Sequence, residues 1–586
     1  MRFVLVLLAC SGLLLGAAIQ KPAAYPARIK PPAIGVHPAM DYFRTEAPQF
    51  STACQALLSS LQQLPTRDPA ALLKARQQLI TCRLHYKRIE SFLEYFFHIS
   101  ARVYNSPPKY EPEEPDMEYQ HPEGMQVIES LLYKKNPAIR KKELLEQAGA
   151  VASSASDLTA LLYDFHADDP QILESLRLEL IRVITLGITG YDAPLLKSGL
   201  SESLEALRSL RQQLQPYLHP GGSRSDSLDQ MLSGTIAYLG TQAPHPFDKF
   251  DRLAFLKIYA LPLQHQLGAF ITEQQQELNT RNILNYQADN LFSKNALIPE
   301  NFPGASGPIT DSMIQEGKKF FSDRSLSING KRSCATCHAP EKMFTDRLPT
   351  SISMDEHTPL NRNAPTLLYC SYQYQQFWDG RAKTLEDQIK TVLHDPREMN
   401  APDSLITPVI IRCIAAYVRS LHPMNSPFDR YMRGEEKALN AHEKNGANLF
   451  MGKAQCATCH FMPLFNGLIP PDYQLTEYEV LGTTATDRLE APRISRDKGR
   501  YELYPFSFYK GAFKTPTVRN SAETYPYMHN GAFRNLEKLM DFYNRGGGAG
   551  LGISVPSQTL PAEPLHLSPG EIKDIIAFLH ALTDQL

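Results

Sequence analysis

One five-residue motif occurs twice in this chain of 586 residues. The copies are Cys334-Ala335-Thr336-Cys337-His338 and Cys456-Ala457-Thr458-Cys459-His460. In a Cys-x-x-Cys-His motif the two thiols add across the vinyl groups of a haem, and the His ligates its iron. The repeat therefore predicts two covalently bound c-type haems. The predicted attachment residues are Cys334, Cys337, Cys456 and Cys459, and the predicted iron ligands are His338 and His460.

A single copy of this motif could instead be half of a zinc site or a redox-active dithiol. A structural zinc site takes four Cys or His ligands, and neither copy has a second Cys/His pair close to it in the sequence. Both alternatives stay open, but two identical copies favour haem.

The first residues have the pattern of an export signal. Met1-Arg2 precedes an apolar run over residues 3–15, and small residues follow it. We therefore predict a signal peptide over residues 1–19 and a periplasmic location, which agrees with haem attachment outside the cytoplasmic membrane. The run is shorter than the about 20 residues that span a bilayer. Leu8-Ala9-Cys10 is a poor lipidation motif, so we expect no lipid anchor at Cys10.

The length indicates about three domains. We predict a Pro-rich tether over 20–41, a helical domain over 42–295, and two cytochrome domains over 312–432 and 435–586. The helical pattern continues to about residue 290, and Pro and Gly are concentrated over 296–310. The predicted fold class is all-α, an N-terminal helical bundle followed by two c-type cytochrome domains. The net charge of −2 gives no reason to expect a nucleic-acid partner.

Local signals mark several helices. Asp68-Pro69 is typical of a helix start, and Ser568-Pro569-Gly570-Glu571 is a capping box before the last helix. The helix after Asp68 carries an apolar stripe at alternating steps of three and four residues, formed by Leu79, Cys82, Tyr86, Ile89, Leu93 and Phe96. In an oxidising compartment Cys54 and Cys82 could form a disulfide; two buried thiols are the alternative.

Residues 45–220 loosely resemble the imelysin-like helical domain, through residues 86–90 and 124–132. That family carries a Gly-x-His-x-x-Glu motif proposed to bind metal. Here Gln126 stands where the His would be, and an amide is a poor ligand for transition metals. We therefore expect a shared architecture without a metal, and Glu90 and Glu129 as surface or helix-pairing charges.

Six further segments surround the two pentapeptides. They are Phe320-Phe321-Ser322-Asp323, Phe344-Thr345-Asp346, Arg362-Asn363-Ala364-Pro365-Thr366, Gln376-Phe377-Trp378-Asp379-Gly380-Arg381, Phe513-Lys514-Thr515-Pro516-Thr517-Val518-Arg519-Asn520 and Tyr527-Met528-His529-Asn530-Gly531. In this order, the chain from Gly317 onward resembles the bacterial di-haem cytochrome c peroxidase and MauG family. The resemblance implies that peroxide reacts at the first haem and that the second haem relays electrons.

The resemblance also implies roles for three side chains around the first haem. Trp378, the single Trp of the chain, would lie between the haems; a core aromatic is the alternative. Glu398 would move the proton during O–O cleavage, a role that suits a desolvated carboxylate, and an ion pair with Arg397 is its alternative. Gln388 would position peroxide or water by hydrogen bonding.

The axial ligands depend on spacing. A loop His blocks the first iron in many family members, and His357 lies in that loop, with His394 as a competitor. Tyr543 falls at the position of the second haem's sixth ligand, which is Met in peroxidases and Tyr in MauG-type proteins. Met540 is its rival, one turn earlier on the same helix face. A Tyr ligand would favour ferric or higher iron.

Asn363, with the backbone carbonyls of Thr524 and Pro526, matches the family's Ca²⁺ site, and oxygen ligands suit that ion. The predicted function is reduction of hydrogen peroxide with electrons from a small redox protein, a cytochrome c or a cupredoxin. Oxidation of a protein substrate, as by MauG, and pure electron transfer are the alternatives. The resemblance also implies a homodimer.

Overall fold

The computed structural model describes residues 33–65, 68–113, 118–219, 221–276, 279–304 and 308–586. The described chain is mostly helical, which confirms the all-α prediction at that level. Strands are limited to two short antiparallel pairs, β1 (Glu111–Glu113) with β2 (Glu118–Gln120) and β3 (Tyr478–Val480) with β4 (Ala512–Lys514). Within the described ranges, no helix has the length and apolar character needed to cross a bilayer. The predicted signal peptide lies outside these ranges.

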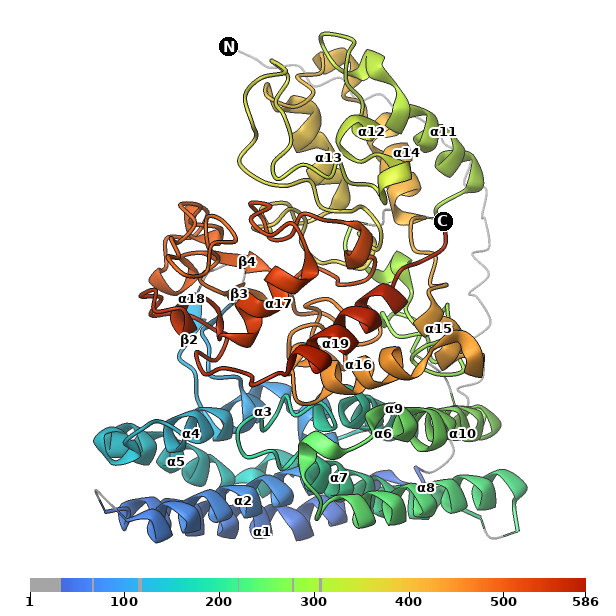
Figure 1. Cartoon of the computed structure of the whole chain (residues 1–586). Coiled ribbons are helices and arrows are strands. Elements are labelled where there is room, and N and C mark those ends of the chain that lie inside the picture. The colour runs from blue at the N-terminus through green and yellow to red at the C-terminus, as the bar shows by residue number, and fades with distance from the viewer. Residues whose placement is uncertain (1–32, 66–67, 114–117, 220, 277–278, 305–307) are drawn as a thin grey trace, which may run out of the picture.

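The N-terminal half forms the helical layers at the base of Figure 1. Helix α1 packs along α2 and α5, α2 packs on α7, and α8 packs on both α7 and α10. The helices are α1 (Val36–Gln62), α2 (Pro69–Phe96), α3 (His98–Asn105), α4 (Met125–Leu132), α5 (Lys141–Ala155), α6 (Asp169–Arg182), α7 (Gly199–Leu214), α8 (Ser223–Gln242), α9 (Arg252–Phe255) and α10 (Leu261–Glu273).

Helix α2 begins where its capping residue predicts. The Asp68 carboxylate accepts hydrogen bonds from the backbone N–H groups of Ala70 and Ala71, which satisfies donors that a helix start leaves unpaired. Phe96 is the one residue of the predicted stripe that is partly exposed to solvent. The others are buried: Leu79, Cys82, Tyr86, Ile89 and Leu93.

Two helix boundaries differ from the sequence prediction. Helix α1 begins at Val36, inside the stretch predicted to be a tether, and includes Pro38. A Pro in the first helical turn is tolerated because its missing N–H would have no partner there. The rest of the predicted tether, up to residue 32, lies outside the described ranges.

The helical pattern also ends earlier than predicted, since α10 stops at Glu273 and no α-helix forms over 279–304. Three Asn side chains explain this. Asn279, Asn285 and Asn290 each accept a hydrogen bond from the backbone N–H two residues later, at 2.9–3.0 Å. Such local bonds compete with helical hydrogen bonding and favour turns.

The C-terminal half lies above the helical layers in Figure 1, with α15 to α19 next to them and α11 to α14 farthest away. Its helices are α11 (Asp311–Ser322), α12 (Cys334–Cys337), α13 (Leu385–His394), α14 (Pro408–Arg419), α15 (Pro427–Met432), α16 (Ala441–Met451), α17 (Leu536–Asn544), α18 (Gly547–Gly550) and α19 (Pro569–Ala581). The predicted capping box of Ser568 and Glu571 starts α19.

The same helix crossing occurs twice in this half. Helix α11 packs on α14, and α16 packs on α19. A Gly lies at each crossing. A Cβ on Gly317 would come within 1.8 Å of the Cys413 carbonyl oxygen, and one on Gly446 within 1.9 Å of the Asp574 carbonyl oxygen. Gly therefore lets the two backbones approach closely, and each pentapeptide follows the first helix of its own crossing.

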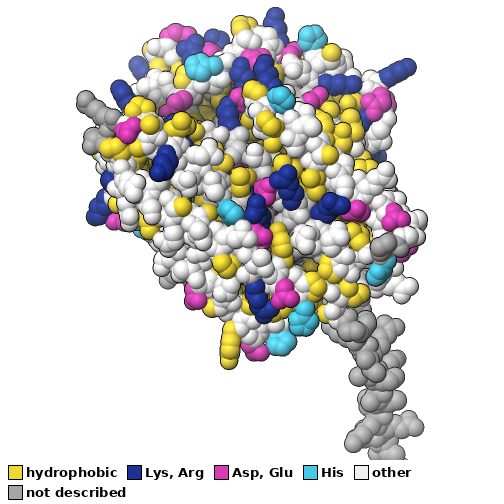
Figure 2. Space-filling model, turned by 90° about the horizontal axis from the view of Figure 1, so that it is seen from below, with side chains coloured by type: hydrophobic (Ala, Val, Ile, Leu, Met, Phe, Trp, Pro, Cys, Tyr) yellow, Lys and Arg dark blue, Asp and Glu magenta, His cyan; other side chains and the backbone are white. Residues whose placement is uncertain are grey.

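The two halves share a continuous set of buried apolar side chains. The Asn448 side chain on α16 accepts a hydrogen bond from the Leu253 backbone N–H of α9 at 2.9 Å. The opposite face of the helical layers points away from the C-terminal half, and there basic and acidic side chains are interspersed with apolar ones (Figure 2).

Candidate functional site

The first pentapeptide forms the short helix α12, closed by a capping box between Ser333 and Thr336. The His338 ring approaches the Phe344 carbonyl oxygen with its Nδ1 at 3.1 Å. A carbonyl only accepts, so Nδ1 carries the hydrogen and Nε2 is left with a lone pair for a metal. Burial lowers the pKa of His338, which favours this neutral form.

The second pentapeptide forms a 3-10 turn without a side-chain cap, but its His is held in the same way. His460 Nδ1 lies 3.0 Å from the Pro516 carbonyl oxygen and 3.3 Å from that of Phe465. Phe344 and Phe465 both have left-handed backbones, with φ of 58° and 53°, and these conformations turn their carbonyls toward the ring. Both imidazoles are therefore fixed in the tautomer that a haem iron requires.

The chemistry of these residues fits haem. All four Cys are free, partly buried thiols beside a His whose Nε2 can ligate iron. Across the described ranges, no group of three or more His, Cys, Asp or Glu side chains is arranged to hold a metal ion.

Trp378 lies where the two halves of the predicted di-haem site meet. Its indole N–H donates to the Asn363 carbonyl oxygen at 3.0 Å, and its own carbonyl accepts from the Lys514 backbone N–H at 2.8 Å. The Asn363 backbone N–H in turn donates to the His529 carbonyl oxygen at 2.8 Å. Trp378 is thus tied to segments on both sides of the site.

His529 is a buried residue that the sequence analysis did not single out. Its ring stacks on Phe513 with centroids 3.7 Å apart, and its Nε2 lies 3.2 Å from Ser495 Oγ. Burial lowers the pKa of His529 to about 4. A sequence signal was available, because Trp378 and His529 stand two residues before a Gly in two of the segments that carry the family resemblance. In the structure residues 376–382 and 527–533 form turns of equal length, with Trp378 and His529 at the same position.

Glu398 lies near the first pentapeptide. Burial raises its pKa, and the nearby charge of Asp395 raises it further. Burial raises the pKa of Cys334 and of Cys337, and the Glu398 charge is a smaller cause acting on both, so that Glu398 and the two thiols share one electrostatic environment. Arg397, the predicted alternative partner, instead pairs with Asp395 at 3.4 Å. Gln388 is half-buried on α13.

The two candidate His ligands of the first iron are exposed. His357 lies in a turn in which its backbone N–H donates to Asp355 at 2.9 Å. His394 lies at the end of α13, with Nδ1 2.8 Å from the Lys390 carbonyl oxygen. An imidazole that ligates a haem iron is covered by the porphyrin, whereas both rings are exposed in this conformation. Ligation by His357 therefore stays a prediction.

Tyr543 and Met540 both approach the second pentapeptide from α17. Burial raises the pKa of Tyr543, and Cys459 and Cys456 are the next largest causes. Met540 is buried in a small apolar cluster against which Cys456 packs. Helix α17 ends before Gly546, whose φ of 80° suits the expected position after a helix end. Both side chains thus remain candidates for the sixth ligand.

Two of the three predicted calcium residues, Asn363 and Pro526, are in contact. The Asn363 side-chain amide donates to the Leu348 carbonyl oxygen at 3.0 Å and to that of Pro526 at 3.4 Å. Thr524 lies two residues before Pro526. A Ca²⁺ ion would require the amide to turn so that its oxygen faces the carbonyls.

In the N-terminal half, Glu90 and Glu129 were expected to be surface or helix-pairing charges, and the surface alternative is wrong. They are only 2% and 1% exposed. Glu129 accepts from the backbone N–H groups of Leu195 and Leu196, and burial raises its pKa to about 7. Glu90 pairs with Lys87, one turn earlier on the same helix, at 2.6 Å. The pattern of α2 gave no sign that this charged pair lies inside the bundle.

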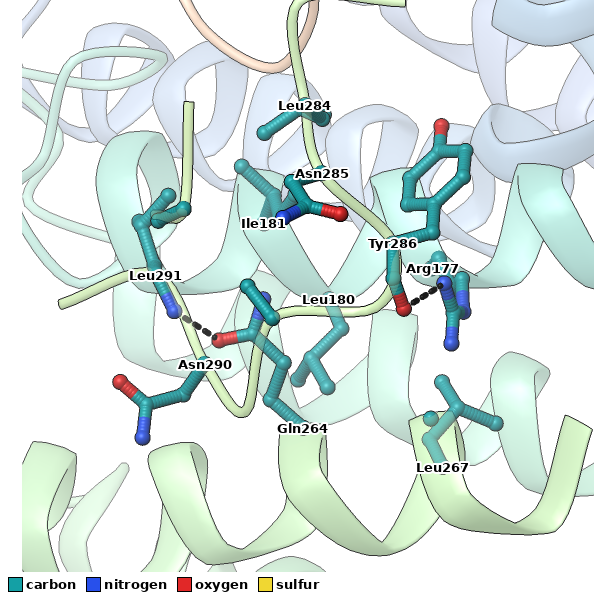
Figure 3. A pocket seen from close by; sticks show the side chains of 13 residues that line it. Arg177, Leu180, Ile181, Gln264, Leu267, Leu284, Asn285, Tyr286, Asn290 and Leu291 are labelled. Atoms are coloured by element: carbon teal, nitrogen blue, oxygen red, sulfur yellow. Dashed lines mark hydrogen bonds between the residues drawn. The ribbon is translucent and has the colours of Figure 1, made fainter. Parts of the chain in front are cut away.

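A small cavity of about 30 Å³ lies in the same half, between α6, α10 and the turns of residues 284–296 (Figure 3). Arg177 donates to the Tyr286 carbonyl oxygen there, and Gln264 accepts from the Leu291 backbone N–H. The space suits about one water, and no residue of either pentapeptide lines it.

Comparisons with known proteins agree with this geometry. The family model of the di-haem cytochrome c peroxidases matches residues 311–410. The methylamine utilization protein MauG of Methylorubrum extorquens is 30% identical over 310 residues, which cover 48% of this chain and 82% of that protein. This chain belongs to the di-haem cytochrome c peroxidase and MauG family.

Other family members match the same half of the chain. The cytochrome c551 peroxidase of Pseudomonas aeruginosa is 30% identical over 351 residues, 55% of this chain and 92% of that protein. A MauG-like protein associated with microbial copper homeostasis is 29% identical, with a TM-score of 0.41, and the match covers 48% of this chain and 92% of that one. As a member of this family the protein is an oxidoreductase with two c-type haems.

Proposed function

We propose that the protein reduces hydrogen peroxide at the first haem, with electrons that arrive through the second haem. The difference between the two pentapeptides carries this proposal. The first has a carboxyl, Glu398, whose pKa burial raises and whose charge acts on its thiols. The second has Tyr543 and Met540, two groups that can close an iron to substrate.

Each side chain has a distinct task in this proposal. A bound haem would supply the iron that takes up peroxide. Glu398 accepts the proton of the peroxide oxygen nearer the iron and returns it to the departing oxygen, which then leaves as water. Gln388 orients peroxide by hydrogen bonding. Trp378, hydrogen-bonded to Asn363, provides an aromatic link between the two haem segments.

Oxidation of a protein residue is the second candidate function. It is favoured by the position of Tyr543, since a phenolate ligand would stabilise oxidised iron at the second haem. The relative from Methylorubrum extorquens is itself named as a methylamine utilization protein.

Steady-state peroxide consumption by the full-length, haem-loaded protein tests the proposal. The donors are a reduced cytochrome c, a reduced cupredoxin and no donor. We expect turnover with at least one donor and fast haem oxidation when peroxide meets the reduced protein. A pure electron-transfer cytochrome would show neither. Consumption of peroxide without any small donor, together with oxidation of an added protein, would favour the MauG-like function.

We further propose the domain division given by the sequence, export to the periplasm, a homodimer, and a Ca²⁺ ion held by Asn363 and the carbonyls of Thr524 and Pro526. The proximity of Asn363 and Pro526 supports the calcium site. Turnover measured before and after chelation, with Ca²⁺ added back, tests it.

A further inference from the structure

The helical half touches the second haem segment through the Tyr191 ring. Tyr191 follows α6 and packs edge-on against Phe461, with ring centroids 5.3 Å apart and an interplanar angle of 71°. Phe461 is fully buried and directly follows His460. This aromatic contact therefore brings a phenol from the helical half next to the ligand of the second haem.

The Tyr191 hydroxyl has a carboxyl partner. It donates to Glu477 Oε1 at 3.4 Å, and Glu477 is only 3% exposed. Glu479, two residues along the chain, is also buried and contacts the same lysine as Glu477, Lys109. The Tyr191 hydroxyl is thus the first member of a short chain of proton-carrying groups, of which the two carboxyls are buried.

Lys109, which precedes β1 in the helical half, completes this chain. Its ammonium pairs with Glu477 and also lies 3.3 Å from Glu479. Burial raises the pKa of Glu477, whereas Lys109 lowers the pKa of Glu479 to about 2 against the cost of burial. Within this pair Glu477 therefore takes up a proton more readily than an ordinary carboxyl, and Glu479 less readily.

The Glu479 charge also reaches the second haem segment. Burial lowers the pKa of His460 and raises that of Tyr543, and the Glu479 charge is a smaller cause acting on both. The proton chain and the predicted ligands of the second iron thus share one electrostatic environment, to which the helical half contributes Lys109 and Tyr191.

We propose that Tyr191 is a redox-active side chain that gives an electron to the second haem when no external donor is present, with the Glu477–Glu479 pair taking its proton. This inference rests on the proposed function, because hydrogen peroxide supplies the oxidising equivalents. Reduction of peroxide to two waters requires two electrons and two protons.

In the proposed step the Tyr191 O–H bond breaks. Its proton moves to Glu477 Oε1, so that the Glu477–Glu479 pair gains the proton that the phenol loses. The electron leaves the ring through the contact with Phe461 and reduces the oxidised second haem, so that a neutral phenoxyl radical remains on Tyr191. One electron from a later donor, with return of the proton along the same chain, restores the phenol.

Tyr191→Phe tests the step because it removes the hydroxyl and keeps the ring that packs on Phe461. The full-length, haem-loaded protein is mixed with one equivalent of hydrogen peroxide without a donor, frozen, and measured by electron paramagnetic resonance. We expect a radical signal in the wild type that narrows when ring-deuterated tyrosine is incorporated. The signal should be lost in Tyr191→Phe.

Tyr217→Phe is the matched control. Tyr217 lies in the helical half, is buried, and like Tyr191 donates to a carboxylate, that of Asp169, at 2.7 Å. This variant should keep the signal. Glu477→Gln keeps Tyr191 but cannot relay a proton, so the radical should form more slowly than in the wild type. Matching melting temperatures establish that the variants are folded.

A second arm replaces peroxide by photogenerated tris(bipyridine)ruthenium(III), which oxidises the protein directly. If peroxide is not consumed, the proposed function fails and this arm alone decides the role of Tyr191. In either arm, an unchanged radical in Tyr191→Phe, or the absence of a tyrosyl radical from an oxidised wild type, would overturn the inference.

Discussion

At the scale of single residues, position relative to the two pentapeptides separates otherwise equivalent groups. His338 and His460 are held in the same tautomer by backbone carbonyls. Glu398 lies near the first pair of thiols, and Tyr543 lies near the second pair. A proton-transfer group and an iron ligand are different kinds of chemistry, so the two sites are expected to behave differently.

Glu398→Gln should lower the rate of peroxide reduction by about 10²–10⁴-fold, the usual contribution of a positioned proton-transfer group. The carboxylate is the active form, so the wild-type rate should fall as pH falls through the pKa of Glu398. Because that pKa is raised above 4.5, the acid limb should lie above this value. The turnover rate is measured as a function of pH.

The exposed Glu316, which pairs with Lys319 at 2.6 Å, provides the control. Glu316→Gln should retain the wild-type rate and acid limb. An acid limb that survives in Glu398→Gln would assign the titration to another group.

Tyr543→Phe and Met540→Leu distinguish the two candidate ligands of the second iron. If Tyr543 is the ligand, only its substitution should change the optical and magnetic resonance spectra of the second haem and raise its reduction potential, because an anionic oxygen donor is removed. If only Met540→Leu alters these spectra, the Tyr assignment is wrong and a peroxidase-type ligand set is favoured.

At the scale of secondary-structure elements, the helix crossings of the two haem segments depend on Gly. Gly317 and Gly446 both face a backbone carbonyl of the crossing helix. By contrast, Gly149 on α5 has no atom within 4 Å of the position of a Cβ. A methyl group at these sites should therefore have opposite effects.

Gly446→Ala should destabilise the protein by at least about 1–3 kcal/mol, the range for overpacking a core. Gly149→Ala, the matched control, should stabilise it by about 0.4–1 kcal/mol because it restricts the unfolded chain. Chemical denaturation of both variants measures these changes. Equal stabilities would show that α16 and α19 do not cross as closely as described.

The contact between α1 and α2 places Cys54 and Cys82 together, with Sγ atoms 3.1 Å apart and both side chains buried. We predict that they oxidise to a disulfide in the oxidising compartment to which we propose the protein is exported, and this disulfide would contribute about 3 kcal/mol. Intact mass before and after reduction under denaturing conditions should differ by two hydrogens. The control Cys413→Ser should keep this mass difference, and Cys82→Ser should lose it. If reduction does not change the mass of the wild type, Cys54 and Cys82 are two buried thiols and the prediction is wrong.

At the scale of the whole molecule, buried ion pairs join segments that are far apart in the sequence. Arg519 and Asp429 are 1% and 2% exposed and form two hydrogen bonds, at 2.8 and 2.9 Å. Arg519 also donates to the Pro463 carbonyl oxygen. This pair fixes α15 against the segment that follows β4.

Arg519→Met should cost about 3–5 kcal/mol, because it leaves the Asp429 carboxylate buried without its partner. The control is Arg430→Met on α15, the helix that carries Asp429. Arg430 pairs with the exposed Glu435 at 3.1 Å, and the loss of such a pair costs about 0–1 kcal/mol. Thermal and denaturant unfolding of the two variants should show this difference, and similar losses would contradict it.

The sequence was informative where the responsible signal is local. The start of α2 at Asp68 follows from side-chain capping of its own first turn. It was less informative over residues 279–296, where Asn side chains form turns inside an apparently helical pattern. It gave no indication that Glu90 and Glu129 are buried, because burial depends on packing between helices.

The sequence by itself determined the family and the two c-type haems, because a Cys-x-x-Cys-His motif carries its attachment and its ligand within five residues. Only the tertiary structure decided what surrounds each motif. Tyr191 and Lys109 meet Glu477 across 286 and 368 residues of chain, and His529 meets Asn363 through packing of distant segments. Such contacts depend on how helices and loops pack, which no short sequence pattern specifies.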